Sequence, residues 1–155
     1  MSQLFDLPIL LCSAASALAY VLVTKSKDEN WSMFGGGGKS DLTDERLEKV
    51  MEDAKKNGDI VFIKIYAEWC GFCKAIFDEW EKLYDEYPAD GNIKICAVEG
   101  DVSKNVKSYF DFGGFPTIIL YNGKTDKKIN YSGERTVDEF KKFITSMTRI
   151  AIATT

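Results

Sequence analysis

Two cysteines, Cys70 and Cys73, are separated by two residues in the stretch IYAEWCGFCKAIF. Thiols at this spacing hold a metal ion, close a small structural disulfide, or carry electrons by thiol–disulfide exchange. The chain contains no histidine, so its own residues form neither a Cys/His zinc site nor a histidine-dependent triad. Zinc bound by cysteine alone needs four thiolates, and one of the four cysteines, Cys12, lies in an apolar N-terminal run. We therefore expect no metal at this pair.

The pair stands where a buried strand gives way to a helix. Residues 59–67 form an almost continuous apolar run, as expected of a central strand covered on both faces. Unpaired N–H groups at the start of the following helix favour negative charge and lower the pKa of a thiol at Cys70. Cys73, one turn later on the same helix face, is placed to attack a mixed disulfide at Cys70. The alternative is a structural disulfide or two idle thiols, although so short a loop would stabilise the fold little.

The periodicity of apolar residues and the turn signals predict the elements that position this pair. The predicted helices cover residues 42–58, the cysteines to about 87, 104–110, and a last helix opened by a capping box at 136–139. The remaining predicted strands cover residues 93–98, 117–121 and 127–131, the last two joined by an Asn-Gly turn. Strands that alternate with helices pair in parallel, and a hairpin adds an antiparallel edge. We predict an α/β fold: a mixed four-stranded sheet with helices on both faces.

The N-terminal part of the chain differs in composition from the rest. Residues 7–24 carry no charge and are close to the shortest stretch that spans a bilayer as a helix. We predict that residues 1–24 contain a hydrophobic helix that acts as a single-pass membrane anchor. A cleaved secretory signal and a buried core helix are the alternatives. Residues 25–41, with four consecutive glycines, are predicted to be a flexible linker, residues 42–149 the domain and residues 150–155 a tail.

The stretch YAEWCGFCK, residues 66–74, resembles the active-site motif of the thioredoxin superfamily, including the catalytic domains of protein disulfide isomerases. GGFPT, residues 113–117, is similar to the family's loop with a cis proline, and YNG and YSGERT are similar to its hairpin and the entry to its last helix. The resemblance covers about residues 42–147. It implies a thioredoxin-like fold and a thiol–disulfide oxidoreductase that needs no cofactor beyond its redox-active disulfide.

The resemblance also implies roles for the residues around the pair. Cys70 would be the nucleophile, more exposed and more acidic, and Cys73 the resolving thiol. Trp69, Gly71 and Phe72 would lie beside them and meet the substrate. Isomerases have histidine where this chain has Phe72, and that histidine's positive charge favours the thiolate. Without it, we expect a less oxidising pair than in an isomerase.

Two further positions follow from the proline loop and the hairpin. The resemblance implies a cis bond between Phe115 and Pro116, and the backbone of Phe115 would pair with an extended client segment. A trans proline at the start of a strand is the plainer alternative. Arg135 would approach the resolving cysteine, whereas an ordinary solvated loop arginine is the competing interpretation.

Lys64 departs from the family pattern. It stands six residues before Cys70, where the family usually carries a buried carboxylate. A buried ammonium needs a partner, and Glu99 ends the neighbouring predicted strand. We therefore expect either a Lys64–Glu99 pair beneath the active site, or a Lys64 side chain that reaches the surface and leaves the thiols alone.

Two functional classes follow. The first is an enzyme that exchanges electrons with cysteine-containing proteins and with a separate redox partner. The second is a client-binding module in which the cysteines are secondary. A net charge of −4 does not favour nucleic acid. Lysines after the apolar run favour a cytosolic domain, whereas an isomerase role would require a lumenal or extracellular one. Cys96, in a predicted buried strand, is expected to act as a small hydrophobic residue.

Overall fold

The structure, a computed structural model, describes residues 38–153 of the 155-residue chain, with side-chain surroundings through Arg149. The predicted anchor or signal at residues 1–24 and the linker up to residue 37 lie outside the described residues. Between residues 38 and 153, none of the helices combines the length and the apolar character that crossing a bilayer requires.

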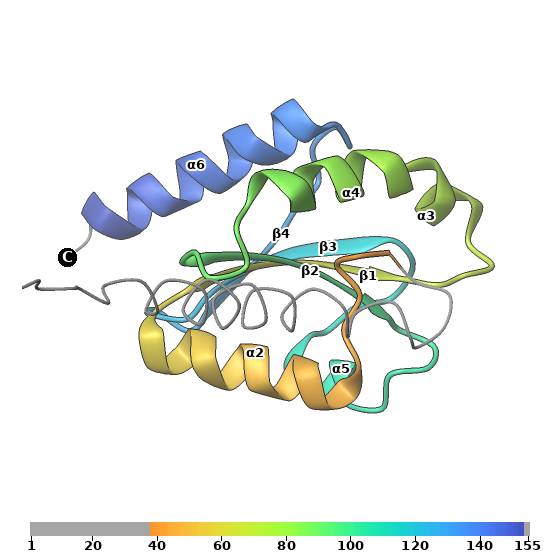
Figure 1. Ribbon diagram of the computed structural model, residues 1–155, viewed down its shortest axis with the longest axis horizontal. Coiled ribbons are helices and arrows are strands. Elements are labelled where there is room, and N and C mark those ends of the chain that lie inside the picture. Colours follow the sequence, from red (N-terminus) through yellow and green to blue (C-terminus); the bar gives the residue numbers. More distant parts are fainter. Residues whose placement is uncertain (1–37, 154–155) are drawn as a thin grey trace, which may run out of the picture. The chain divides into compact units, whose positions relative to one another are not determined.

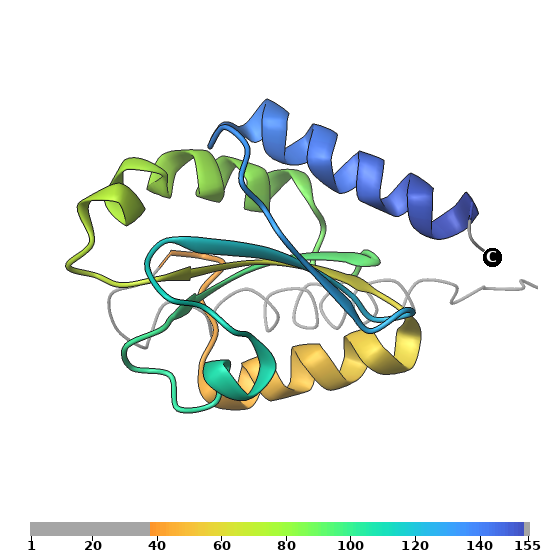
Figure 2. The same ribbon diagram turned by 180° about the vertical axis from the view of Figure 1, so that it is seen from behind.

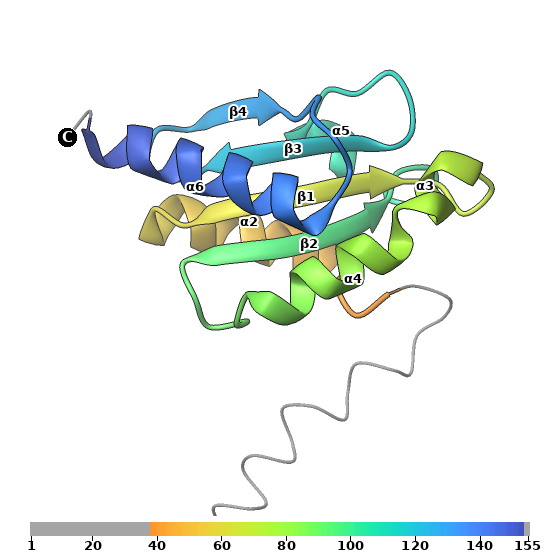
Figure 3. The same ribbon diagram turned by 90° about the horizontal axis from the view of Figure 1, so that it is seen from above.

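The described chain alternates helices and strands in the predicted order. The elements are α2 (Asp44–Asn57), β1 (Ile60–Tyr66), α3 (Gly71–Ala75), α4 (Phe77–Glu86), β2 (Ile93–Glu99), α5 (Val106–Tyr109), β3 (Thr117–Asn122), β4 (Lys127–Asn130) and α6 (Val137–Ala153). The strands lie in the order β2-β1-β3-β4 (Figure 3). β1 pairs in parallel with β2 and antiparallel with β3, and β4 is the antiparallel edge. The predicted mixed four-stranded sheet is confirmed.

Helices cover both faces of this sheet. α3, α4 and α6 lie on one face, and α2 and α5 lie on the other (Figures 1 and 2). β1 is buried along nearly its whole length because it is an inner strand covered on both sides. Successive β1 side chains therefore enter different cores: Val61 and Ile63 face α2, while Phe62 faces α4 and α6.

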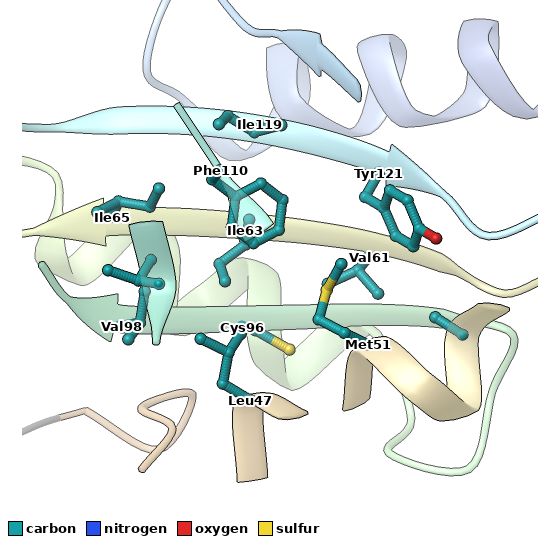
Figure 4. Packing of buried hydrophobic residues seen from close by; sticks show 12 residues of the cluster. Leu47, Met51, Val61, Ile63, Ile65, Cys96, Val98, Phe110, Ile119 and Tyr121 are labelled. Carbon is teal, nitrogen blue, oxygen red and sulfur yellow. The ribbon is translucent and has the colours of Figure 1, made fainter. Parts of the chain in front are cut away.

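Cys96 lies in the core on the α2 face. It is 4% exposed and sits among Leu47, Met51 and Val61 (Figure 4). Burial raises the pKa of its thiol to about 12. Cys96 is thus a packing residue whose thiol stays protonated at neutral pH, in line with the sequence-based expectation.

The helix before β1 ends where the sequence predicts. Thr43 caps its start, because the Thr43 hydroxyl accepts a hydrogen bond from the Arg46 N–H. Gly58 ends it with φ of 78°, a left-handed conformation that glycine adopts without a steric penalty. The Gly58 N–H also donates to the carbonyl of Ala54. This tight end returns the chain directly into β1.

The helix predicted from the cysteines to residue 87 is divided in two. Ile76 leaves the helical conformation, with φ of −102° and ψ of 4°, and separates α3 from α4. Its side chain is buried in the core on the α4 face. The break lets the short α3 carry the cysteines at the end of the sheet while α4 packs over the sheet itself (Figure 3).

The described residues include four that precede the predicted domain boundary at residue 42. Residues 38–41, here called the strap, run beside β2. The Ala97 N–H donates to the Ser40 carbonyl, and the Leu42 N–H donates to the Ala97 carbonyl, each at 2.8 Å. Asp41 thus forms a parallel bridge with Ala97. The end of the predicted linker is therefore part of the sheet edge. At the other end, α6 extends past residue 149 to Ala153.

Candidate active site

Cys70 occupies the N-cap position of α3. That helix begins just beyond the carboxyl end of β1 (Figure 3). Its backbone is extended, with φ of −79° and ψ of 113°, which turns the side chain back over the first helical turn. The Cys73 N–H donates to the Cys70 sulfur at 3.3 Å. This is the free helix-start N–H that the sequence predicts beneath the first cysteine. Both cysteines are free thiols in this structure.

The two thiols differ in electrostatics more than in exposure. Their residues are only 6% and 4% exposed, so the expected difference in exposure is small. Burial opposes the charged form of Cys70, but hydrogen bonds from the Cys73 thiol and from the N–H groups of Cys73 and Phe72 lower its pKa below the ordinary value. Burial raises the pKa of Cys73 to about 11, and its hydrogen bond to Cys70 adds to this. At neutral pH, Cys70 supplies the larger fraction of thiolate.

We expect an alkylating reagent at pH 6 to modify Cys70 of the reduced protein at least about tenfold faster than Cys73. The thiolate fractions differ by about 100-fold or more, and the greater intrinsic reactivity of the more basic thiolate offsets part of this. Peptide mapping after a short pulse of iodoacetamide measures the order. Cys96, with its pKa of about 12, serves as the unreactive internal control. Equal labelling of Cys70 and Cys73 would contradict this assignment.

The proline loop borders Cys70. The Phe115–Pro116 peptide bond is cis, which confirms the expectation. β3 begins at the next residue and pairs antiparallel with β1, with Thr117 opposite Ile65. This pairing brings the loop to the end of β1, where the Cys70 thiol donates to the Phe115 carbonyl at 3.6 Å.

Gly100 allows the Phe115 ring to pack at this position. A Cβ atom at Gly100 would lie 2.5 Å from that ring, closer than side chains approach one another. The Gly100 N–H donates to the Tyr66 carbonyl at 2.8 Å, which fixes the loop after β2 against the end of β1. Nothing in the local sequence around Gly100 marks this contact, which depends on a loop distant along the chain.

Exposed apolar side chains surround the pair. Trp69 is 71% exposed and Phe72 is 74% exposed, although both are large hydrophobic residues. The Trp69 indole N–H donates to the Asp101 carboxylate, and its ring packs edge-on against Phe115 with centroids 5.9 Å apart. Gly71, between the cysteines, is exposed, and a Cβ there would meet nothing within 4 Å. Of the substrate-binding residues expected from the resemblance, Trp69, Gly71 and Phe72 are therefore exposed, whereas Phe115 and Pro116 are partly buried.

Lys64 is buried, at 3% exposure, in the middle of β1. Its ammonium lies 5.1, 5.6 and 5.4 Å from the ring centroids of Tyr66, Phe77 and Trp80. Such cation–π contacts replace part of the hydration that burial removes. The alternative in which the Lys64 side chain reaches the surface is therefore wrong, because α4 covers this face of β1.

The predicted Lys64–Glu99 ion pair is also wrong. Lys64 lies opposite Ala97 in the parallel register, and Glu99 lies one pleat further along, opposite Tyr66. The carboxylates that favour the charged form of Lys64 are those of Asp41 and Glu81. These negative charges lie on the strap and on α4 rather than at the end of β2.

Arg135 lies in an exposed loop before α6. Its positive charge contributes to lowering the pKa of Cys70, the nucleophile. Among the described residues, no group of three or more Cys, Asp or Glu side chains is arranged to hold a metal ion.

Comparison with known proteins is consistent with this geometry. A family model described as thioredoxin matches residues 40–146. The chain is 38% identical over 106 residues to a protein disulfide-isomerase of Oryctolagus cuniculus, covering 68% of this chain and 20% of that protein. It is 31% identical over 139 residues to protein disulfide-isomerase 1 of Dictyostelium discoideum, covering 88% of this chain and 34% of that protein. The chain thus spans only a fifth to a third of the length of these relatives.

Solved structures show the same fold. The first thioredoxin domain of mouse protein disulfide-isomerase A4 superposes with a TM-score of 0.52 at 25% identity, covering 70% of this chain and 82% of that one. A chloroplastic thioredoxin z superposes with a TM-score of 0.57 at 18% identity, covering 76% of this chain and 98% of that one.

Proposed function

Since the chain belongs to the thioredoxin family, we propose that it is a thiol–disulfide oxidoreductase that exchanges electrons with cysteine-containing proteins. The observation that carries the proposal is the paired geometry at the start of α3. The Cys70 sulfur accepts a hydrogen bond from the Cys73 N–H at 3.3 Å. The Cys73 thiol, which must resolve a mixed disulfide at Cys70, lies one helical turn away. The disulfide isomerases among its relatives support the same activity for this domain.

The reaction proceeds by two exchanges. The Cys70 thiolate attacks one sulfur of a client disulfide, forms a mixed disulfide with it, and releases the other client sulfur as a thiolate. The Cys73 thiolate then attacks the Cys70 sulfur, forms the Cys70–Cys73 disulfide, and releases the second client sulfur. The client gains two electrons and the protein loses two. The reverse sequence oxidises a client dithiol, and a separate redox partner restores the starting state.

The client would approach over the exposed surface beside Cys70. Its backbone would pair with Phe115 in the loop that ends in Pro116, and its side chains would meet Trp69, Gly71 and Phe72. Phe72 adds no positive charge next to the thiolate, so we propose a pair less oxidising than that of an isomerase. We therefore infer that the clients present a cysteine within an extended, partly apolar segment.

Replacing both Cys70 and Cys73 by serine should reduce turnover of a protein disulfide substrate to the uncatalysed rate, because both exchange steps need these sulfurs. The assay follows reduction of a disulfide-bonded unfolded protein by dithiothreitol with wild type and with the double variant. A Cys96→Ala variant, which removes a buried thiol outside the site, should keep wild-type turnover. Full activity of the double variant would instead support a client-binding module in which the cysteines are secondary.

We also propose a membrane location from the sequence alone. The uncharged run at residues 7–24 would attach the domain to a membrane, with a cleaved secretory signal as the alternative. This segment lies outside the described residues. The side of the membrane on which the domain works depends on whether it reduces or oxidises its clients.

A further inference from the structure

A positive charge is buried one side chain away from the redox pair, because Tyr66 packs both against the cluster of Cys70 and Cys73 and against the Lys64 ammonium, 5.1 Å from its ring centroid. Lys64 lies on the same face of β1 as Tyr66, beneath Phe77 and Trp80 of α4. A buried ammonium without a countercharge is costly, so its surroundings must favour the charged form or the group must lose its proton. Which of the two occurs decides whether Cys73, on the neighbouring α3, experiences a cation.

The register of the sheet brings a countercharge to Lys64 from the strap. Asp41 is bridged in parallel to Ala97, and Ala97 is paired in parallel to Lys64. Residues aligned in this way point to the same face of a sheet. Two strand spacings separate Asp41 from Lys64 by about 10 Å at their backbones. The residue between them is alanine, whose methyl group leaves the space open for an aspartate and a lysine side chain to extend toward each other.

Asp41 is fixed in this position by its own contacts. Its carboxylate accepts a hydrogen bond from the Tyr66 hydroxyl at 2.8 Å. The Tyr66 ring is in turn one of the three rings around the Lys64 ammonium, at 5.1 Å. Asp41, Tyr66 and Lys64 therefore form one connected group that reaches from the strap to the strand below the cysteines.

The strap is held against α4 by further polar contacts. The Lys39 N–H donates to Glu81 at 2.9 Å, and the Ser40 hydroxyl donates to the same carboxylate at 3.3 Å. The Lys39 ammonium pairs with Asp85 at 2.8 Å. A Cβ atom at Gly38 would lie 2.2 Å from the Glu81 carboxylate, so the strap approaches α4 as closely as glycine permits. The placement of Asp41 is thus built into the fold.

We propose that Asp41 keeps Lys64 charged and that this buried cation stabilises the thiolate of Cys73 when it resolves the mixed disulfide. Asp41 is then a positioning residue, and the strap is part of the redox site. The inference rests on the oxidoreductase function proposed above and adds the group that controls its second step.

The electrostatics of the four groups that face Lys64 agree with this arrangement. Burial lowers the pKa of Lys64, while Asp41 from the strap, Glu81 from α4 and Cys73 from α3 each raise it. Tyr66, on the same strand, donates its hydroxyl hydrogen to Asp41. Burial raises the pKa of Asp41 as well, but the Tyr66 hydrogen bond and the Lys64 charge oppose that rise. The Lys64 charge also acts to lower the pKa of Cys73, against burial.

The resolving step is a thiol–disulfide exchange that needs no other oxidant or reductant. The Cys73 thiol loses its proton to water and attacks the Cys70 sulfur. The Cys70–Cys73 bond forms as the bond from Cys70 to the client sulfur breaks, and the client leaves as a thiolate that takes up a proton from water. Lys64 remains an ammonium throughout. It acts only through its charge, which favours the thiolate form of Cys73 before the attack.

The first test removes the cation. Lys64→Met keeps the bulk of the side chain, and we expect the pKa of Cys73 to rise by about one unit. The fraction of Cys73 present as thiolate at pH 7 then falls about tenfold. Because a more basic thiolate is a stronger nucleophile, each remaining thiolate reacts about threefold faster. Release of a small aromatic thiol from a preformed mixed disulfide at Cys70 should therefore slow about threefold. The pKa is read from the Cβ signal of labelled Cys73 by NMR, in a Cys70→Ser background.

The second test removes the countercharge. Asp41→Asn should lower the pKa of Lys64 by about one unit or more and raise the pKa of Cys73, in the same direction as Lys64→Met. The Asp41→Asn/Lys64→Met double variant should show no larger Cys73 shift than Lys64→Met alone. In a Lys64→Arg background, Asp41→Asn should leave the Cys73 pKa unchanged, since arginine stays charged without a partner.

Asp85→Asn is the matched control. It removes a carboxylate that also holds the strap, through Lys39, but that does not act on Lys64. We expect Asp85→Asn to leave the pKa values of Lys64 and Cys73 unchanged. The proposal is overturned if Lys64→Met leaves the Cys73 pKa unchanged, or if Asp41→Asn shifts it no more than Asp85→Asn does. These titrations need no client, so they remain informative if the protein fails to exchange disulfides, a result that would count against the proposed function instead.

Discussion

A Cys73→Ser variant is expected to accumulate covalent complexes with client proteins through Cys70. Cys70 still forms the mixed disulfide, but the thiol that lies one turn away and should release the client is gone. Release then depends on a thiol from solution, and an intramolecular attack of good geometry exceeds millimolar external thiol by about 10³-fold or more. The mixed disulfide should therefore outlive its wild-type counterpart by about that factor.

The complexes are measured by non-reducing electrophoresis after acid quenching, with and without a reductant in the sample. Cys70→Ser should yield none, because Cys73, with its pKa of about 11, is a poor nucleophile at neutral pH. Cys96 is too buried to substitute for either thiol. Adducts at equal levels in the Cys70→Ser and Cys73→Ser variants would show that the roles of the two cysteines are not divided as the structure indicates.

Replacing Phe62 by alanine is expected to lower the free energy of unfolding by about 3–5 kcal/mol. Phe62 is fully buried and stacks on Trp80 with ring centroids 5.3 Å apart. It also packs against Phe140 at 5.7 Å and Phe143 at 6.0 Å. Alanine would leave a cavity among aromatic rings that α4, α6 and the sheet hold in place, so the site cannot collapse to fill it.

Urea unfolding followed by tryptophan fluorescence and by circular dichroism measures this loss. The expected loss is a large share of the 5–15 kcal/mol typical of a domain. The urea concentration at the midpoint of unfolding should therefore fall strongly, while the dependence of the unfolding free energy on urea concentration stays constant. Val102→Ala is the matched control, since Val102 is 69% exposed and its truncation should change the stability by no more than about 0.5 kcal/mol. A loss below 1 kcal/mol at Phe62 would mean that this aromatic core repacks freely.

The sequence alone determined the parts of this protein that depend on neighbouring residues. The apolar run of β1, the cysteine pair at the start of α3, the left-handed Gly58 and the β3–β4 hairpin are each specified within a few residues. The turn of that hairpin differs from the prediction, because Asn122 ends β3 and Asp126, with φ of 56°, takes the left-handed conformation. The order of helices and strands along the chain then allows few ways to pair the strands. Strands joined by helices pair in parallel, and the hairpin must add an antiparallel strand. The cis peptide before Pro116 was expected only from the resemblance of GGFPT to the thioredoxin loop, since local preferences equally allow a trans proline at the start of a strand.

The tertiary structure decided which groups meet beneath the cysteines. Asp41 follows a glycine-rich stretch whose composition predicts a linker, and only its bridge to Ala97, far along the chain, makes it part of the sheet. Glu99 ends the adjacent strand, but the register sets Ala97, not Glu99, beside Lys64. The break at Ile76 is likewise invisible in a continuous helical pattern. Partners of a buried charge depend on strand register and on side chains from distant elements, and neither is encoded in local periodicity.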